Sequence, residues 1–415
     1  MYSHSATGHD TAPRPGVPQA LALALGAAVS LGLARFSYAL LLPPMRDDLG
    51  WSYFTAGAMN TANATGYLVG ALLMPRWLAR ADARWVLLAG MLVAALLLAA
   101  HGLADGEVML LLLRAATGMA SAGTFVAGGL MAARLGQALA TDPAHRHRGA
   151  LVLGLYYGGT GAGIVASTLL VPAAAQWASG VGAGGGVGLG WRAAWVALAV
   201  AALAATALAA RGTRVLAAPP PPVGGGARAP WSKLGWALAG YLCFGLGYIG
   251  YMTFVITLLR ERGLSVLHVH AFYLLLGVGV MVSPWLWSGL LQRHRSGMPL
   301  ALLNGLLALA TALPVAVGGV WAVYASGALF GAVFLSLVAS TTALVRHNLA
   351  PAAWASGIAA FTIIFAAGQI IGPSLVGAIA DGAGGLQRGF AISAGLLALG
   401  AVLATMQRAL PTPKT

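Results

Sequence analysis

Two arginines, Arg35 and Arg114, interrupt long apolar stretches of the sequence, and no Asp or Glu lies inside any of those stretches. An arginine stays protonated even when it leaves water, so its guanidinium must find oxygen acceptors or an anion. The pair therefore predicts either a binding site for an anionic group such as a carboxylate, or structural arginines that donate to backbone carbonyls. The missing carboxylates argue against organic cations and hard metal ions as ligands.

Aromatic and amide side chains accompany the arginines. Tyr38 lies one helical turn after Arg35, and Tyr248 and Tyr251 occupy corresponding positions in a later segment. Rigid rings that carry a hydroxyl suit an oriented organic ligand, so we expect these tyrosines to line a cavity. Amides inside apolar segments join helices more often than they bind a ligand. Three of them complete the candidate binding residues: Asn60, Asn63 and Gln369.

The composition places these residues in a membrane. Of the 415 residues 59% are hydrophobic and 8% are charged, against about 45–50% and 25% in soluble domains. A membrane helix needs roughly 20 apolar residues, and cutting the chain at its charges and Gly/Pro clusters predicts twelve such helices. They cover residues 18–42, 52–74, 85–104, 108–133, 149–175, 193–210, 234–259, 267–291, 298–317, 321–345, 352–380 and 389–406. The predicted fold class is an all-α polytopic membrane protein.

The positive charges predict the orientation of these helices. With the N-terminus inside, sixteen of the 23 Lys and Arg residues fall in inner segments and five in outer ones. Positive residues accumulate on the cytoplasmic side, so both termini are expected in the cytoplasm of a cell whose inner membrane holds the chain. The net charge of +14 thus indicates topology and not nucleic-acid binding. The first residues lack the apolar core of a secretory signal, which predicts an uncleaved first helix.

An internal repeat predicts two pseudo-symmetric six-helix bundles, residues 18–210 and 234–406. At an offset of 213 residues Gly50 aligns with Gly263 and Ser52 with Ser265. Residues 211–233 hold four consecutive prolines and three consecutive glycines, a composition typical of a linker, here cytoplasmic. Cytoplasmic tails are expected at residues 1–17 and 407–415. Parallel repeats of this kind are a transporter design in which substrate binds near mid-membrane between the halves.

Several motifs resemble a known family. The run Gly-Leu-Ala-Arg-Phe-Ser-Tyr at residues 32–38, with Leu-Pro-Pro-Met at 42–45 and Gly-Leu-Gly-Tyr at 245–248, is similar to the bacterial YbfB/YjiJ-type branch of the major facilitator superfamily (MFS). Arg114 and Gly118 match the superfamily's Arg-x-x-x-Gly motif. The resemblance covers nearly the whole chain, and it implies that helices one, four, seven and ten line a central cavity. It also implies a possible part for Arg114 in proton coupling.

Other residues suggest conformational switching. Asp82 and Arg84 only partly reproduce the superfamily's gating loop between helices two and three, because its second glycine and paired arginines are missing. Two glycine sets predict close helix packing, at which we expect the halves to slide or pivot. They are Gly154, Gly158, Gly159, Gly161 and Gly163 in helix five, and Gly368 and Gly372 with Pro373 in helix eleven. The expected gating residues are Asp82, Arg84, Gly118, Gly159, Gly163, Gly368, Gly372 and Pro373.

The leading hypothesis is a secondary active transporter that moves a small organic anion, such as a carboxylate, by alternating access as a proton symporter. The alternative is export of hydrophobic or amphipathic compounds, as in multidrug efflux. The spacing of His294 and Met298 leaves copper transport as a minor alternative. No nucleophile–base pair, metal cluster or nucleotide motif lies in the predicted helices, so we expect no enzyme. We expect no cofactor beyond an ion gradient, no metal site, and a monomer whose partners are its substrate and the lipid bilayer.

Overall fold

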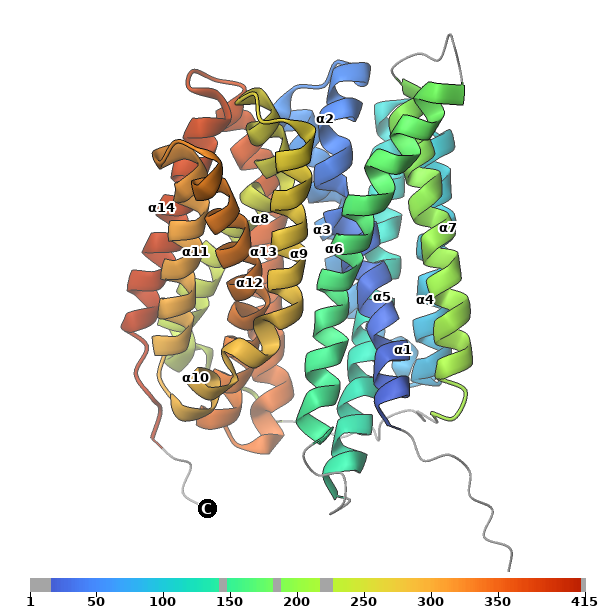
Figure 1. Cartoon of the computed structure of the whole chain (residues 1–415). Helices are drawn as coiled ribbons and strands as arrows, with labels where there is room; N and C mark the ends of the chain where they lie inside the picture. The colour runs from blue at the N-terminus through green and yellow to red at the C-terminus, as the bar shows by residue number, and fades with distance from the viewer. Residues whose placement is uncertain (1–15, 142–147, 182–187, 217–226, 412–415) are drawn as a thin grey trace, which may run out of the picture.

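A computed structural model describes residues 16–141, 148–181, 188–216 and 227–411, and these residues form helices joined by short loops (Figure 1). The first-half helices are α1 (Val17–Ala27), the π-helix η1 (Ala28–Phe36), α2 (Tyr38–Leu49), α3 (Tyr53–Leu78), α4 (Ala83–Leu103), α5 (Glu107–Thr141), α6 (Arg148–Val181) and α7 (Gly188–Gly212). The second-half helices are η2 (Trp231–Leu234), α8 (Gly235–Glu261), α9 (Val266–Leu286), α10 (Ser288–Arg293), α11 (Met298–Ala316), α12 (Val320–Asn348), η3 (Pro351–Ala353), α13 (Trp354–Ala380) and α14 (Gly385–Thr405).

Eleven helical segments of the described ranges are long and apolar enough to cross a membrane. The predicted second span corresponds to α3, whose 26 residues give a length of about 39 Å. It is not among the eleven. Asn60, Thr61 and Asn63 make its middle more polar than the other helices, and polar residues inside a membrane protein mark contacts with neighbouring helices or a cavity.

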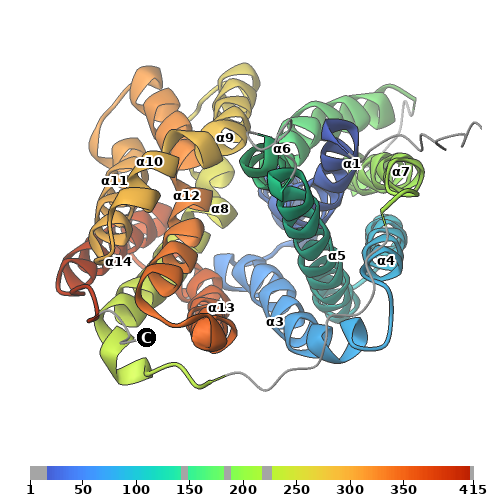
Figure 2. The same ribbon diagram turned by 90° about the horizontal axis from the view of Figure 1, so that it is seen from below.

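The helices lie in two groups when the molecule is seen along their axes. Figure 2 shows α3–α7 on one side and α8–α14 on the other. Across the two groups α3 packs against α13 and α6 packs against α9. Parts of the predicted tails, of the loop at 179–190 and of the linker at 211–233 lie outside the described residues. The repeat symmetry of the two halves stays a prediction.

The first membrane helix extends seven residues further than its predicted end at residue 42. Pro43 and Pro44 suggested a break, but both lie inside α2, which continues to Leu49. Neighbouring helices bury this segment, and a transmembrane helix tolerates proline where its surroundings satisfy the freed backbone groups. Arg35 therefore lies fourteen residues, or about 21 Å, before the end of this helix at Leu49, whereas the predicted end at residue 42 put it seven residues before the end. Arg46, expected in an outer loop, is in the last turn of α2.

Two pairs of residues that the repeat aligns have the same local role. Gly50 and Gly263 both have positive φ, 65° and 76°, and follow the ends of α2 and α8. Ser52 and Ser265 are both N-caps, and their hydroxyls accept from the backbone N–H of Thr55 and His268. The chain thus turns in the same way between the first two helices of each half, since αL glycines end helices and serines begin them.

Backbone carbonyls of the π-helical segment η1 accept hydrogen bonds from side chains of other helices. A π-helix places its hydrogen bonds five residues apart, as in the bond from Ser37 N–H to the Gly32 carbonyl of 3.1 Å. Carbonyls at its end accept further bonds, at Ala34 from Arg114 and at Phe36 from Tyr273. Such segments often occur at functional sites, and Arg35 lies in the last turn of this one.

Candidate functional site

Arg35 lies between the two groups of helices with part of its guanidinium free. Its side chain is 4% exposed, and its Nη2 donates to Oε1 of Gln369 on α13. Its Nε has no hydrogen-bond partner in the described part of the chain. The guanidinium carbon is 5.7 Å from the centre of the Tyr67 ring and 5.9 Å from that of Phe36. This arrangement leaves a buried donor and a full positive charge available to a ligand.

Two tyrosines, Tyr67 of α3 and Tyr248 of α8, lie near this guanidinium. A third, Tyr157 of α6, lies beside Tyr67. None of the three hydroxyls has a hydrogen-bond partner within the described residues. Buried tyrosine hydroxyls usually find a partner. Tyr248 is buried and Tyr67 and Tyr157 are half-buried, so this region offers three hydroxyls to a polar ligand or to water.

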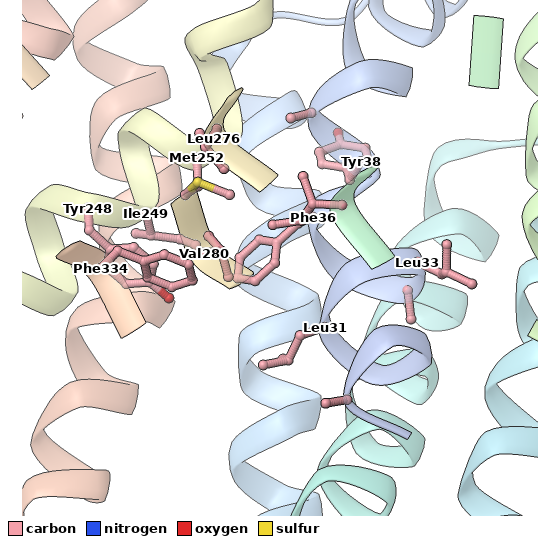
Figure 3. Packing of buried hydrophobic residues seen from close by; sticks show 14 of the residues in the cluster. Leu31, Leu33, Phe36, Tyr38, Tyr248, Ile249, Met252, Leu276, Val280 and Phe334 are labelled. Atoms are coloured by element: carbon pink, nitrogen blue, oxygen red, sulfur yellow. The ribbon is translucent and has the colours of Figure 1, made fainter. Parts of the chain in front are cut away.

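Aromatic rings form the apolar side of the same place. Tyr248 stacks with Phe244 at 4.6 Å, Phe365 at 5.5 Å and Phe334 at 5.9 Å between ring centres, with interplanar angles of 12–25°. Phe36 extends from η1 toward this stack and meets Phe334 edge-on at 5.6 Å (Figure 3). Flat ring surfaces next to one cation suit a ligand that combines an apolar or aromatic body with an anionic group. We call Arg35, Gln369, Tyr67, Tyr157 and Tyr248 the central cluster.

Arg114 is fully engaged with protein acceptors. Its Nη1 donates to the Ala34 carbonyl at 2.9 Å, its Nη2 to Oδ1 of Asn60 at 2.7 Å and its Nε to the Met59 carbonyl at 3.4 Å. The guanidinium also lies 4.7 Å from the ring centre of Tyr38. This geometry matches the structural alternative from the sequence, in which Arg114 ties helix four to helix one through carbonyls.

Two of the predicted tyrosines have occupied hydroxyls. Tyr38 donates to the Ala56 carbonyl at 2.9 Å, and it lies apart from Tyr248 and Phe334 in Figure 3. The Tyr251 hydroxyl is 2.7 Å from Oγ of Ser326, and its ring lies 4.0 Å from that of Phe330 inside the second half. Both side chains are fully buried. Of the three predicted tyrosines, only Tyr248 therefore lies beside Arg35 with an open hydroxyl.

The predicted amides join helices, and one of them also reaches the central cluster. Nδ2 of Asn60 donates to Oγ1 of Thr253 at 2.7 Å, which connects α3 with α8 across the halves. Nδ2 of Asn63 donates to the Arg114 carbonyl at 3.1 Å within the first half. Gln369 alone contacts Arg35 directly.

Four of the predicted gating glycines, Gly159, Gly163, Gly368 and Gly372, pack within a half and not between the halves, so their predicted place is wrong. A Cβ atom added at Gly159 or Gly163 would lie 2.1 or 2.4 Å from carbonyls of α1 and η1, in the same half. At Gly368 or Gly372 it would lie 2.9 or 2.7 Å from the backbone of α8, again in the same half. The spacing of small residues marks a close helix approach but does not identify the partner helix. Gly118 likewise packs on α3, 2.0 Å from the Asn63 carbonyl.

Other glycines lie between the halves, and among them are Gly154, Gly158 and Gly161 of the helix-five set, which face α9 as predicted. A Cβ atom at Gly57 of α3 would lie 2.3 Å from the Pro373 carbonyl, and one at Gly377 would lie 2.3 Å from the Tyr53 carbonyl. One at Gly161 of α6 would lie 2.4 Å from a carbonyl of α9. Pro373 thus lies at a contact between the halves, through its carbonyl. The faces of α3 with α13 and of α6 with α9 thus form the close contacts between the halves.

The partial gating motif has local contacts in the described residues. Oδ1 of Asp82 accepts from the Arg84 backbone N–H at 2.7 Å and caps the start of α4. The Arg84 guanidinium donates to Oγ1 of Thr213 at 3.2 Å and to the Ala210 carbonyl at 2.9 Å, at the end of α7. These bonds hold helices of the first half together.

The sequence analysis missed a set of polar contacts at the end of the molecule where α3 begins. The Asp381 carboxylate, just after α13, accepts from the backbone N–H groups of Tyr53 at 2.7 Å and Phe54 at 2.9 Å. The Tyr53 hydroxyl donates to Glu261 at the end of α8, and Arg46 lies 3.9 Å from the Tyr53 ring centre. We call these five residues the outer contacts, since the charge distribution predicts this end to be outside. They connect one half with the other.

The sequence analysis also missed Tyr67 and Tyr157, although one signal pointed to the first. Asn60, Asn63 and Tyr67 follow one another at spacings of three and four residues, so they share a face of α3. Tyr157 directly precedes Gly158 and Gly159, and the sequence of this segment indicates only a helix-packing surface. Within the described ranges no three His, Cys, Asp or Glu side chains lie close enough to hold a metal ion together. Nδ1 of His294 is 3.2 Å from the Leu290 carbonyl in an exposed loop.

Comparisons with known proteins agree with this architecture. A family model described as "Uncharacterised MFS-type transporter YbfB" matches residues 27–405. A chloramphenicol resistance protein of Streptomyces lividans is 34% identical over 192 residues, which are 46% of this chain and 43% of that protein, so less than half of the relative's length is matched.

Two solved structures share the fold. One is a bacterial homologue of the human lysosomal transporter Spinster in an inward-facing, unoccupied conformation, with a TM-score of 0.65, 16% identity and 94% of each chain covered. The other is a variant of the nucleoside transporter NupG, with a TM-score of 0.66, 16% identity, and 93% of this chain and 99% of that chain covered. The matched family and both structures are transporters and not enzymes.

Proposed function

Because this chain belongs to the YbfB-type family of MFS transporters, we propose that it is a secondary active transporter of a small organic anion with an apolar or aromatic body. The observation that carries this proposal is Arg35, a buried cation with an unpartnered Nε and no acid beside it. A carboxylate would supply the missing acceptor through a charge-assisted hydrogen bond. Arg114 is less suited to this role because its donors already have protein acceptors.

The surroundings of Arg35 support the same class of ligand. The open hydroxyls of Tyr67, Tyr157 and Tyr248 offer further donors, and the stacked rings beside Tyr248 offer an apolar surface. Gln369 contacts Arg35 from the other half, so a ligand bound here touches both halves at once. Alternating access requires that property, since the site must respond to the movement of one half against the other.

We propose proton coupling through the substrate. Within the described helices acids occur only at the ends, for example Asp47, Glu107 and Glu261. No buried carboxylate of these helices is available to carry a proton across. An organic acid that moves together with a proton crosses without net charge, and an inward proton gradient then drives its uptake.

Export of amphipathic compounds is the second candidate. The partial match to a chloramphenicol resistance protein favours it, as does the large aromatic surface of the central cluster. A neutral compound with hydroxyl or amide groups would use the tyrosine hydroxyls and would not need the charge of Arg35. The two candidates therefore differ in how strongly they depend on that charge.

The test compares three variants in proteoliposomes with a panel of aromatic and aliphatic carboxylates, chloramphenicol and a cationic drug. Arg35→Gln should abolish saturable carboxylate flux and the thermal shift that carboxylates induce. Arg35→Lys should restore part of both, because a point charge cannot reproduce the forked donor. Arg114→Gln is the matched control, and it should lower the melting temperature because it removes three bonds to protein acceptors.

Carboxylate flux at the normal rate in Arg35→Gln would overturn the anion proposal. Chloramphenicol flux that depends on Tyr67 and Tyr248 but not on Arg35 would establish the exporter instead. Carboxylate uptake that does not change the internal pH would overturn the proton coupling alone.

A further inference from the structure

A groove between helices of the first half opens to the surface of the molecule, away from the central cluster. It measures about 650 Å³ and runs between α3 and α4, with α5 as its floor. Its walls include Trp77, Trp85, Val93, Leu97 and Met119, and apart from Arg80 the residues that line it are apolar or glycine. None of the central-cluster residues lines it. Apart from the Arg80 guanidinium and the indole N–H groups of Trp77 and Trp85, the walls carry no polar side chain.

The groove has the depth of one leaflet of a bilayer. Trp85 and Leu97 on α4 are twelve residues apart, which corresponds to about 18 Å along the helix axis. Half of a hydrocarbon core of about 30 Å is about 15 Å. Trp77 and Trp85, at the loop end of the groove, are 45% and 65% exposed, as is typical of tryptophans at a membrane–water interface. The groove thus extends from the interface toward the middle of the membrane.

Two exposed arginines lie at the loop end of α3, and neither guanidinium has a partner among the described residues. Arg80, in the turn that follows α3, lines the groove, and Arg76, in the last turn of α3, directly precedes the lining residue Trp77. Arg84, by contrast, donates to the end of α7. The charge distribution of the sequence places this end on the cytoplasmic side, where anionic lipids attract arginines near the surface.

We propose that this groove binds one anionic phospholipid of the cytoplasmic leaflet. An acyl chain fills the apolar groove along α4, and the phosphate accepts hydrogen bonds from Arg76 and Arg80 at its mouth. The guanidinium forks suit a phosphate, and the interfacial tryptophans flank the headgroup. The complementarity between two unpartnered cations and an anionic headgroup distinguishes this site from ordinary contact with annular lipid.

The test measures lipid retention by native mass spectrometry and thermal stability of the purified chain in mixed micelles. Phosphatidylglycerol is compared with phosphatidylcholine, which has similar chains but no net charge. We expect one phosphatidylglycerol molecule to be retained and to raise the melting temperature more than phosphatidylcholine does. The double change Arg76→Gln and Arg80→Gln should lower the affinity for phosphatidylglycerol about 30-fold, two surface charges' worth, and leave the lipid-free melting temperature unchanged.

Two matched controls and a second variant complete the design. Arg293→Gln removes an exposed arginine of the same predicted side, on α10, and should change nothing. Ala89→Trp places a large ring in the groove and should reduce retention of both lipids, whereas Ala204→Trp on the exposed face of α7 should not. Equal retention of the two lipids by the unaltered chain, or an unchanged preference in the double variant, would overturn the proposal and leave annular lipid only.

Discussion

Removing the Asp381 carboxylate should open the outer end of the molecule. This side chain accepts from two backbone N–H groups at the start of α3, at 2.7 and 2.9 Å. Loss of such a cap costs about 1 kcal/mol, and loss of a negative charge at a helix N-terminus adds about 0.3–1 kcal/mol. Because the bonds connect the two halves, this free energy is lost only in the conformation that brings the outer ends together. Asp381→Ala should therefore lower the ratio of closed to open outer ends about 9–30-fold.

The assay is a distance distribution between spin labels on the two halves at the outer end. Cysteines at Leu103 and Trp321, both highly exposed, carry the labels after Cys243 is replaced by serine. The matched control is Asp105→Asn, which removes the ion pair of 2.7 Å with Arg192 inside the first half. Asp381→Asn should give an intermediate shift because one acceptor oxygen remains. An unchanged distribution in Asp381→Ala, or an equal shift in the control, refutes the reasoning.

Three further predictions concern packing, ligand binding and topology. Gly377→Leu should shift the same distance distribution toward the open form with little loss of melting temperature, whereas Gly163→Leu should destabilise the first half itself; equal losses of melting temperature would contradict this. Tyr251→Phe removes only the bond to Ser326, worth about 0.6–1.7 kcal/mol, so it should lower the melting temperature slightly and keep the carboxylate-induced thermal shift; a lost shift would place Tyr251 in the binding site. A cysteine in place of Arg214 should react with an impermeant label only after permeabilisation, and labelling of intact cells would reverse the predicted orientation.

In the proposed transport cycle the outer contacts close the outer end of the molecule and break when it opens. Asp381 and Glu261 each connect the second half to the start of α3 or its first tyrosine. These residues lie at the ends of helices, in contact with water, where forming and breaking a bond costs little. A transporter needs this kind of weak closure, because the two conformations must differ by only a few kcal/mol.

Most of the membrane helices could be predicted from the sequence, and eleven of the twelve predicted spans correspond to apolar helices of sufficient length among the described residues. Apolarity and length are sums over neighbouring residues, so charges and glycines locate helix ends to within a few residues for most helices. The absence of buried acids and the presence of Arg35 are also properties of the sequence alone. Gly50 and Ser52, which the repeat aligns with Gly263 and Ser265, form turns equivalent to those of their counterparts, because turn and cap chemistry is local.

Which side chains meet follows only from how the helices pack. Gln369 reaches Arg35 across 334 residues of chain, and Tyr67 and Tyr157 join them from helices whose faces hydropathy does not orient. The packing also shows that the donors of Arg114 are occupied by protein acceptors, mostly backbone carbonyls. It shows that Gly163 packs inside one half, whereas Gly377 lies between the halves. In a chain that is apolar on nearly every side, lipid-facing and protein-facing surfaces have similar composition. The partner of each face then follows only from how the helices pack in three dimensions.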